Sequence, residues 1–123
     1  MTIEEKKWEY QNILTLEYKN FHPEETEGLT LDEIALMNPL TEFDFKVFLA
    51  HELMDLTLAI DEKIADINFN KEKINDPKTF HQDITECRSE NVLLEKELQA
   101  LRKKYDDLRR LIPEREKENE RSR

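Results

Sequence analysis

Apolar side chains recur three and four positions apart along most of this chain, the spacing of helices that bury one face. Two such segments lie within residues 1–40, and each follows a threonine that stands three residues before a glutamate, the spacing of a capping box. Each segment stops before a proline, Pro23 or Pro39, because proline disfavours helical geometry in the preceding residue. The sequence therefore predicts two short helices that begin after Thr2 and Thr30.

Residues 41–76 predict one long helix, with Thr41 and an acidic residue three positions later as its start signal. Its first half carries 12 apolar residues in 18, more than one helix face can hold, and Met54, Leu58 and Phe69 lie beside or off the main stripe. We expect the helix to pack against two neighbours or to form the core of a bundle. The predicted contact residues are Phe45, Phe48, Leu49, Leu53, Leu56, Ile60, Ile64 and Ile67.

Residues 77–112 predict the final helix, with Asp76 as N-cap, Pro77 at the first helical position and Pro113 as the stop. A heptad counted from Ile84 as position a places apolar residues at nearly every a and d position, the pattern of a coiled coil. These ten positions, named the seam here, are predicted to bind a partner helix: Phe80, Ile84, Cys87, Asn91, Leu94, Leu98, Leu101, Tyr105, Leu108 and Ile112.

Asn91 is the amide in this seam, at an a position where leucine or isoleucine would bury more apolar surface. An asparagine at a single a position weakens a coiled coil but fixes its register and strand number, because a shifted register leaves the amide buried and unpaired. We interpret Asn91 as such a specificity device. The alternative is an asparagine tolerated near a frayed end or at the edge of a bundle.

Charges beside the seam fit a second copy of the chain poorly. In a parallel homodimer each g residue faces the e residue five positions further on in the partner helix. Two of these pairs attract, Asp83–Arg88 and Glu97–Arg102, and two repel, Glu90–Glu95 and Lys104–Arg109. A different chain or an antiparallel pairing would relieve the repulsion, so we expect a heteromeric partner.

The apolar stripes change phase near residue 76, which either a hairpin or a kinked continuous rod would explain. We expect an all-α fold, an elongated helical bundle or coiled coil with two short N-terminal helices. The predicted parts are the N-terminal helices in 1–40, a bundle-forming amphipathic helix in 41–76, a coiled-coil helix in 77–112 and a polar flexible tail in 113–123.

Composition agrees with long helices, since 39% of the residues are charged and only one is glycine. One cysteine excludes an intrachain disulfide, and the start of the chain lacks the apolar run of a signal peptide. No segment reaches the roughly 20 apolar residues that span a bilayer. We expect an intracellular protein that is neither secreted nor inserted into a membrane.

The excess of acidic residues that gives the net charge of −10 lies before residue 77, and residues 77–123 are close to neutral. An acidic body repels nucleic acid at long range. Residues 102–110 hold a basic cluster that could contact phosphate, although the charged flanks of a coiled coil give a similar pattern. We therefore expect no direct nucleic-acid contact and keep a nucleic-acid adaptor as an alternative.

Candidate chemistry is sparse. His51-Glu52 resembles the start of the zinc motif HExxH, but Asp55 stands in place of the second histidine. Cys87 occupies a seam position where a thiol would be inaccessible. We predict no catalytic residue, no metal site, no cofactor and no small-molecule substrate, and hence no enzyme.

Two segments, residues 42–64 and 105–116, resemble the seventh subunit of the THO mRNA-export complex. The first ends in Glu-Lys-Ile, as in that family, and Glu86-Cys87-Arg88 lies between the two much as a similar triplet does there. The second carries a Tyr-Asp-x-Leu-x-x-x-Ile run followed by proline and arginine: Tyr105, Asp106, Leu108 and Ile112. The first 40 residues have no counterpart, and the connector is longer here. The resemblance implies a non-catalytic nuclear subunit that pairs with helical subunits in coupling transcription to mRNA export.

The function predicted is that of a non-catalytic coiled-coil subunit that assembles a hetero-oligomeric intracellular complex through helix–helix packing with other helical proteins. A nuclear location is favoured over a cytoplasmic one. The alternatives are a THO-like subunit, a kinetochore or tethering-type linker, a homodimeric coiled-coil regulator, or a nucleic-acid adaptor that uses residues 102–110.

Overall fold

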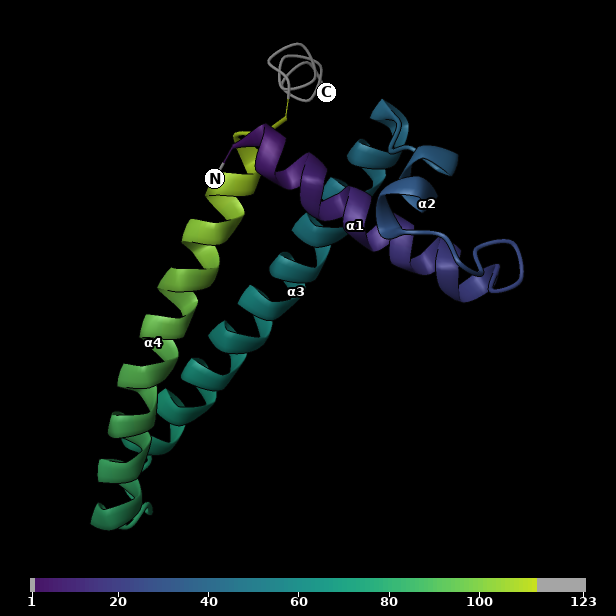
Figure 1. Ribbon diagram of the computed structural model, residues 1–123. Helices are drawn as coiled ribbons and strands as arrows, with labels where there is room; N and C mark the ends of the chain where they lie inside the picture. Colours follow the sequence, from purple (N-terminus) through teal and green to yellow (C-terminus); the bar gives the residue numbers. More distant parts are fainter. Residues whose placement is uncertain (1, 113–123) are drawn as a thin grey trace. The chain divides into compact units, whose positions relative to one another are not determined.

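The computed structural model describes residues 2–112, and all regular structure in this part of the chain is helical (Figure 1). Its helices are α1 (Ile3–Phe21), α2 (Leu31–Met37), α3 (Glu42–Asn75) and α4 (His81–Arg109). The predicted all-α class is confirmed. The first helix, α1, has 19 residues and lies between Thr2 and Pro23, the limits expected from the sequence. The tail predicted for residues 113–123 lies outside the described residues.

The predicted threonine caps begin the first three helices. Thr2 Oγ1 and Thr30 Oγ1 each accept a hydrogen bond, 3.2 Å long, from the backbone N–H three residues further on. Thr41 and Asp44 form a reciprocal pair, in which each side chain accepts from the other residue's backbone N–H at 3.0 and 3.1 Å. These bonds satisfy amides that have no partner inside the helix, so local sequence determines where the helices start.

The chain divides into two compact units, Met1–His51 and Glu52–Arg123, and the division falls within α3. The first unit contains α1, α2 and the beginning of α3. Tyr10 lies at its centre: its ring stacks on Phe48 with centroids 5.1 Å apart and is tilted against Phe45 at 5.5 Å. Aromatic pairs of this kind contribute about 0.5–1.5 kcal/mol beyond the area they bury.

Gln11 joins α1 to the connection between α2 and α3. Its Nε2 donates to the backbone carbonyl of Asn38 at 3.1 Å, and its Oε1 accepts from the backbone N–H of Leu40 at 2.6 Å. One side chain thus satisfies a carbonyl and an amide on both sides of Pro39, where regular helical bonding is interrupted.

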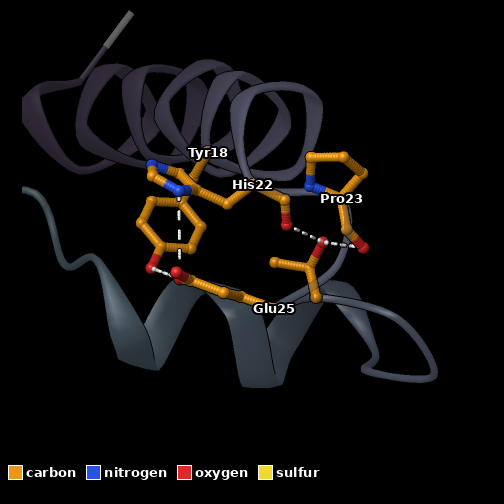
Figure 2. Close-up of polar contacts among 5 residues, drawn as sticks. Tyr18, His22, Pro23 and Glu25 are labelled. Atoms are coloured by element: carbon orange, nitrogen blue, oxygen red, sulfur yellow. Dashed lines mark hydrogen bonds and ion pairs between the residues drawn. The ribbon is translucent and has the colours of Figure 1, made fainter.

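The turn after α1 is held by polar contacts (Figure 2). Tyr18 Oη donates to Glu25 Oε2 at 3.0 Å, and the His22 ring lies against the Tyr18 ring with centroids 4.4 Å apart. Thr26 Oγ1 donates to the His22 carbonyl at 2.8 Å. Gly28, with φ 77°, closes the turn in a conformation that other residues rarely adopt. The hydrogen bond to Glu25 is the main cause of a raised pKa at Tyr18.

The second unit is a helical hairpin, formed by α3 from Glu52 onward and by α4 (Figure 1). Lys63 forms an ion pair with Glu97, and Asn70 contacts Asn91. From Lys63 to Asn70 the residue number rises by seven along α3, whereas from Glu97 to Asn91 it falls by six along α4. The two helices therefore run antiparallel. Of the two arrangements left open at residue 76, the structure has the hairpin.

The expected start of the final helix at Pro77 is wrong, because α4 begins four residues later, at His81. Asp76 Oδ1 accepts from the backbone N–H of Lys78 at 2.9 Å, and the Asp76 carbonyl accepts from Thr79 N–H at 3.1 Å. Asp76 therefore closes a tight turn that reverses the chain instead of capping a helix. At the other end α4 stops at Arg109, and Leu111 and Ile112 continue it only as a turn.

Candidate interaction surfaces

The hairpin interface of the second unit contains a buried amide pair. Asn70 Nδ2 donates to Asn91 Oδ1 at 2.9 Å, and Asn91 Nδ2 donates to the backbone carbonyl of Ile67 at 3.4 Å. The exposed fractions of Asn70 and Asn91 are 5% and 9%. A buried amide without a partner costs about 1–3 kcal/mol, so sliding one helix along the other would separate this pair and be opposed by that cost.

An apolar cluster adjoins the amide pair through Ile67, whose carbonyl accepts from Asn91. Ile67, Leu94 and Leu98 form a buried cluster, and Ile60 and Ile64 pack against it. Burial of side chains of this size contributes about 1.5–3 kcal/mol each relative to exposure. The apolar residues therefore supply the affinity between α3 and α4, and the amides fix their register.

The ion pair between Lys63 and Glu97 lies at the edge of the same interface, with the two side chains 30% and 54% exposed. The hydrogen bond to Glu97 is the main cause of a raised pKa at Lys63, and the nearby charges of Asp66 and Glu62 act in the same direction. Exposed ion pairs contribute little to the free energy of unfolding. This one therefore favours the antiparallel orientation of the two helices without adding much stability.

The predicted seam largely faces inward. Its buried members are Cys87, Asn91, Leu94, Leu98 and Leu108; Ile84, Leu101, Tyr105 and Ile112 are half-buried; and Phe80 is exposed. At its centre the seam packs on α3 of the same chain, through the cluster and the amide pair. That this surface binds a separate partner chain stays a prediction.

The predicted contact residues of α3 are also mostly inside. Phe45, Leu49, Leu53, Leu56 and Ile67 are buried, and Phe48, Ile60 and Ile64 are half-buried. Asn70 was absent from the prediction although it fills a gap in the three-four spacing between Ile67 and Ile74. A polar residue at that gap, opposite another polar residue in the seam, is the signal that would have found it.

A second apolar stripe lies on the outside of α3 within the second unit. Because successive residues are rotated by about 100° around the helix axis, the members of this stripe fall within about 60° of one another. The stripe lies roughly opposite the face of α3 that packs in the hairpin. We name it the outer stripe: Met54, Leu58, Ala65 and Phe69. The exposed fractions of its three large side chains are 59%, 59% and 57%. The sequence pattern placed these residues off the main stripe but did not include them among the contact residues.

Acidic side chains border the outer stripe on both sides and at its C-terminal end. All five are exposed, and none forms an ion pair within the described stretch 2–112: Asp55, Asp61, Glu62, Asp66 and Glu72. We name them the acidic border. The one basic residue beside the stripe is Lys73, whose Nζ lies 4.8 Å from the centroid of the Phe69 ring.

The first unit also exposes large apolar side chains, but they do not form one stripe. On α1, Trp8, Leu16 and Phe21 point in different directions around the helix axis. On α2 the exposed apolar residues are spread around the helix: Leu31, Leu36 and Met37. At the start of α3, Phe43 and Val47 are exposed four residues apart, on one helix face. Scattered apolar residues are normal on a protein surface, so they identify no binding site here.

Residues with the potential for metal or thiol chemistry do not assemble into a centre. Within residues 2–112, no three histidine, cysteine, aspartate or glutamate side chains are grouped as metal ligands. Cys87 is buried in the seam as a free thiol. None of the helices in this range is long and apolar enough to cross a membrane.

Comparison of the chain with protein-family models, curated proteins and solved structures found no match. The hairpin, the outer stripe and the acidic border are therefore the features of the chain that bear on its function.

Proposed function

We propose that this chain is a non-catalytic helical subunit that joins other helical proteins in a hetero-oligomeric intracellular complex. The observation that carries the proposal is the outer stripe, an apolar face of α3 that remains exposed after the opposite face has packed on α4. A helix with two opposite apolar faces can bury both of them only if it lies between two neighbours. The hairpin supplies one neighbour, and a partner helix would supply the other.

The proposed mode of binding is coiled-coil-like packing of that partner helix on the outer stripe. Its length suits this mode, because Met54 to Phe69 extends over about 22 Å at 1.5 Å per residue. Leucine and methionine accommodate partner side chains with several rotamers, so the stripe can pack without a preformed pocket. In this arrangement the amide pair holds the hairpin rigid while the outer stripe binds.

The biological process served by such a subunit stays a prediction. Resemblance to the THO subunit implies mRNA export and a nuclear location, whereas a kinetochore or tethering linker would use the same packing. These alternatives share one physical requirement, an exposed helical face for another subunit, and the first experiment tests that requirement.

The test compares the native size of the wild-type chain with that of the variant Met54→Gln/Leu58→Gln by size-exclusion chromatography of extracts from the source cells. Glutamine keeps helix propensity while removing apolar area. Wild-type protein should elute within a larger assembly, and the variant at the mass of the chain alone.

A matched control changes exposed apolar residues of the same unit that lie outside the stripe, Val92→Gln/Leu93→Gln on α4. This control should keep the native size of the assembly. Circular dichroism of each purified variant separates lost binding from lost folding. A wild-type chain that elutes at its own mass would contradict the proposed function.

A second candidate is a nucleic-acid adaptor that uses the basic cluster on α4. Arg102, Lys103 and Lys104 are exposed, and none forms an ion pair within residues 2–112. Arg110, by contrast, lies 3.8 Å from Asp107, so part of the cluster is neutralised locally. The adaptor predicts binding to RNA or DNA that weakens steeply with salt and with Lys103→Glu/Lys104→Glu. Binding that is absent at low salt would exclude it.

A further inference from the structure

We infer that the partner bound by the outer stripe is a basic amphipathic helix, with lysine or arginine on both sides of its apolar positions. This inference rests on the proposed function and specifies the chemistry of the partner. It is carried by the juxtaposition, on one helix face, of an apolar stripe and the acidic border. Charged residues that flank an apolar helix interface determine which partner is accepted.

The acidic border is only partly compensated within its own helix. Glu62 and Asp66 are four residues apart, a spacing at which like charges on a helix repel each other. Lys63 lies near both, but its hydrogen-bonded partner is Glu97 across the hairpin. A partner with basic flanks would relieve this repulsion and gain the attraction, whereas an acidic partner would add to it.

The same charges oppose a second copy of this chain as the occupant. Two outer stripes packed face to face would bring two acidic borders together, which is unfavourable. The outward face of α4 offers no matching stripe, since its large exposed apolar side chains are the neighbours Val92 and Leu93, which diverge by about 100° around the helix. The charge pattern therefore favours a different protein.

Lys73 marks one end of the binding face. Its ammonium group lies over the Phe69 ring, an interaction that is weak at an exposed site. A basic partner residue can take this position above the ring when the partner helix docks. The face consequently runs from Met54 to Phe69 and ends where Lys73 begins.

The direct test uses two designed helical peptides about 24 residues long, the length of α3 in the second unit. Both carry leucine at three-four spacing; one has lysine and the other glutamate at the flanking positions. Fluorescence anisotropy measures the affinity of each for the full chain. The lysine peptide should bind at least about tenfold more tightly than the glutamate peptide, and its affinity should fall with added salt because the flanking pairs are exposed.

Variants locate the binding. Met54→Gln/Leu58→Gln should lower the affinity of the chain for the lysine peptide by at least about tenfold. The α4 control Val92→Gln/Leu93→Gln should leave that affinity within about twofold of the wild-type value. Equal affinities for the two peptides, or an affinity that Met54→Gln/Leu58→Gln leaves intact, would overturn the inference. So would a dimer of the chain alone, measured by light scattering, that the same variant dissociates.

Charge reversal in the native assembly separates this inference from the proposed function. Glu62→Lys/Asp66→Lys should reduce the assembly to the chain's own mass, while Glu90→Lys/Glu95→Lys, with the same change in net charge on exposed positions of α4, should not. If Met54→Gln/Leu58→Gln disrupts the assembly and Glu62→Lys/Asp66→Lys does not, the function stands and the basic partner is refuted. If neither variant disrupts it, the function fails as well.

Discussion

The two helices of the second unit differ in how they distribute apolar residues. Within this unit, α3 has two opposite apolar faces, one packed in the hairpin and one exposed as the outer stripe. Its partner α4 has one apolar face, the seam, and a largely charged exterior. The two helices are joined along one interface, yet only α3 has an exposed apolar stripe within this unit.

This difference separates the requirements of folding from those of binding. The hairpin needs one apolar face on each helix, and α4 carries no more than that. The additional face of α3 is not buried in the hairpin, and under the proposed function it binds a partner helix. Variants that change one face of one helix at a time can test this separation.

The largest effect is expected from a charge placed within the seam. Leu94→Asp buries an unpaired carboxylate in the cluster with Ile67 and Leu98, which costs several kcal/mol, and should unfold the hairpin at room temperature. Its neighbour Leu93 is 60% exposed, so Leu93→Asp should change the free energy of unfolding by no more than about 0.5 kcal/mol. Urea titration followed by circular dichroism distinguishes the two. Equal stability of the variants would place the seam elsewhere.

The next effect compares the two faces of α3. Leu56 is 8% exposed and Leu58 is 59% exposed, although only two positions separate them. Leu56→Ala should cost about 2–5 kcal/mol of unfolding free energy through lost burial and a cavity, and Leu58→Ala no more than about 0.5 kcal/mol. Thermal denaturation measures both. A large loss of stability in Leu58→Ala would mean that the outer stripe already packs within the chain.

The amide pair should give a smaller, strongly coupled effect. Asn70→Leu and Asn91→Leu each leave the other amide without its side-chain partner and should destabilise the hairpin by about 1–3 kcal/mol. The double variant should recover stability, because two leucines can pack where two amides were bonded. Additive losses in the double-mutant cycle would show that the pair is not coupled.

The smallest effect concerns the ion pair at the interface edge. The pKa of Lys63 is raised from its ordinary 10.5, chiefly by its hydrogen bond to Glu97. Its contribution to stability is therefore complete below that pH and lost as pH rises through the folded-state pKa. Glu97→Gln should remove the part of the loss of stability at alkaline pH that comes from Lys63. The corresponding loss from Tyr18, whose pKa is raised by its hydrogen bond to Glu25, should remain. Urea titrations of both proteins between neutral and alkaline pH provide the comparison.

Helix starts and stops were the most predictable features of the chain. The capping threonines Thr2, Thr30 and Thr41 act within one helical turn, and Pro23 and Pro39 act on the residue before them, so neither needs a distant partner. The helix start expected at Asp76-Pro77 is wrong, because the same two residues can cap a helix or close a turn. Because α4 runs back along α3, Asp76 and Pro77 lie in the turn between the two helices.

Of the candidate surface, the sequence located Asn91 as a polar exception but not Asn70 as its partner. A heptad count gives the position of an amide on its own helix and carries no information about the helix opposite. For the same reason it placed the seam at an interface without indicating that α3 of the same chain would occupy its centre.

By itself, the sequence determined the all-α class, the caps, most helix boundaries and the excess of apolar residues on α3, because these depend on residues within one or two helical turns. Only the tertiary structure decided that the chain reverses at Asp76, that Asn70 bonds Asn91, and which apolar face of α3 remains exposed. The physical reason is that helical periodicity specifies faces, whereas the choice of neighbour for each face depends on contacts between residues distant in sequence.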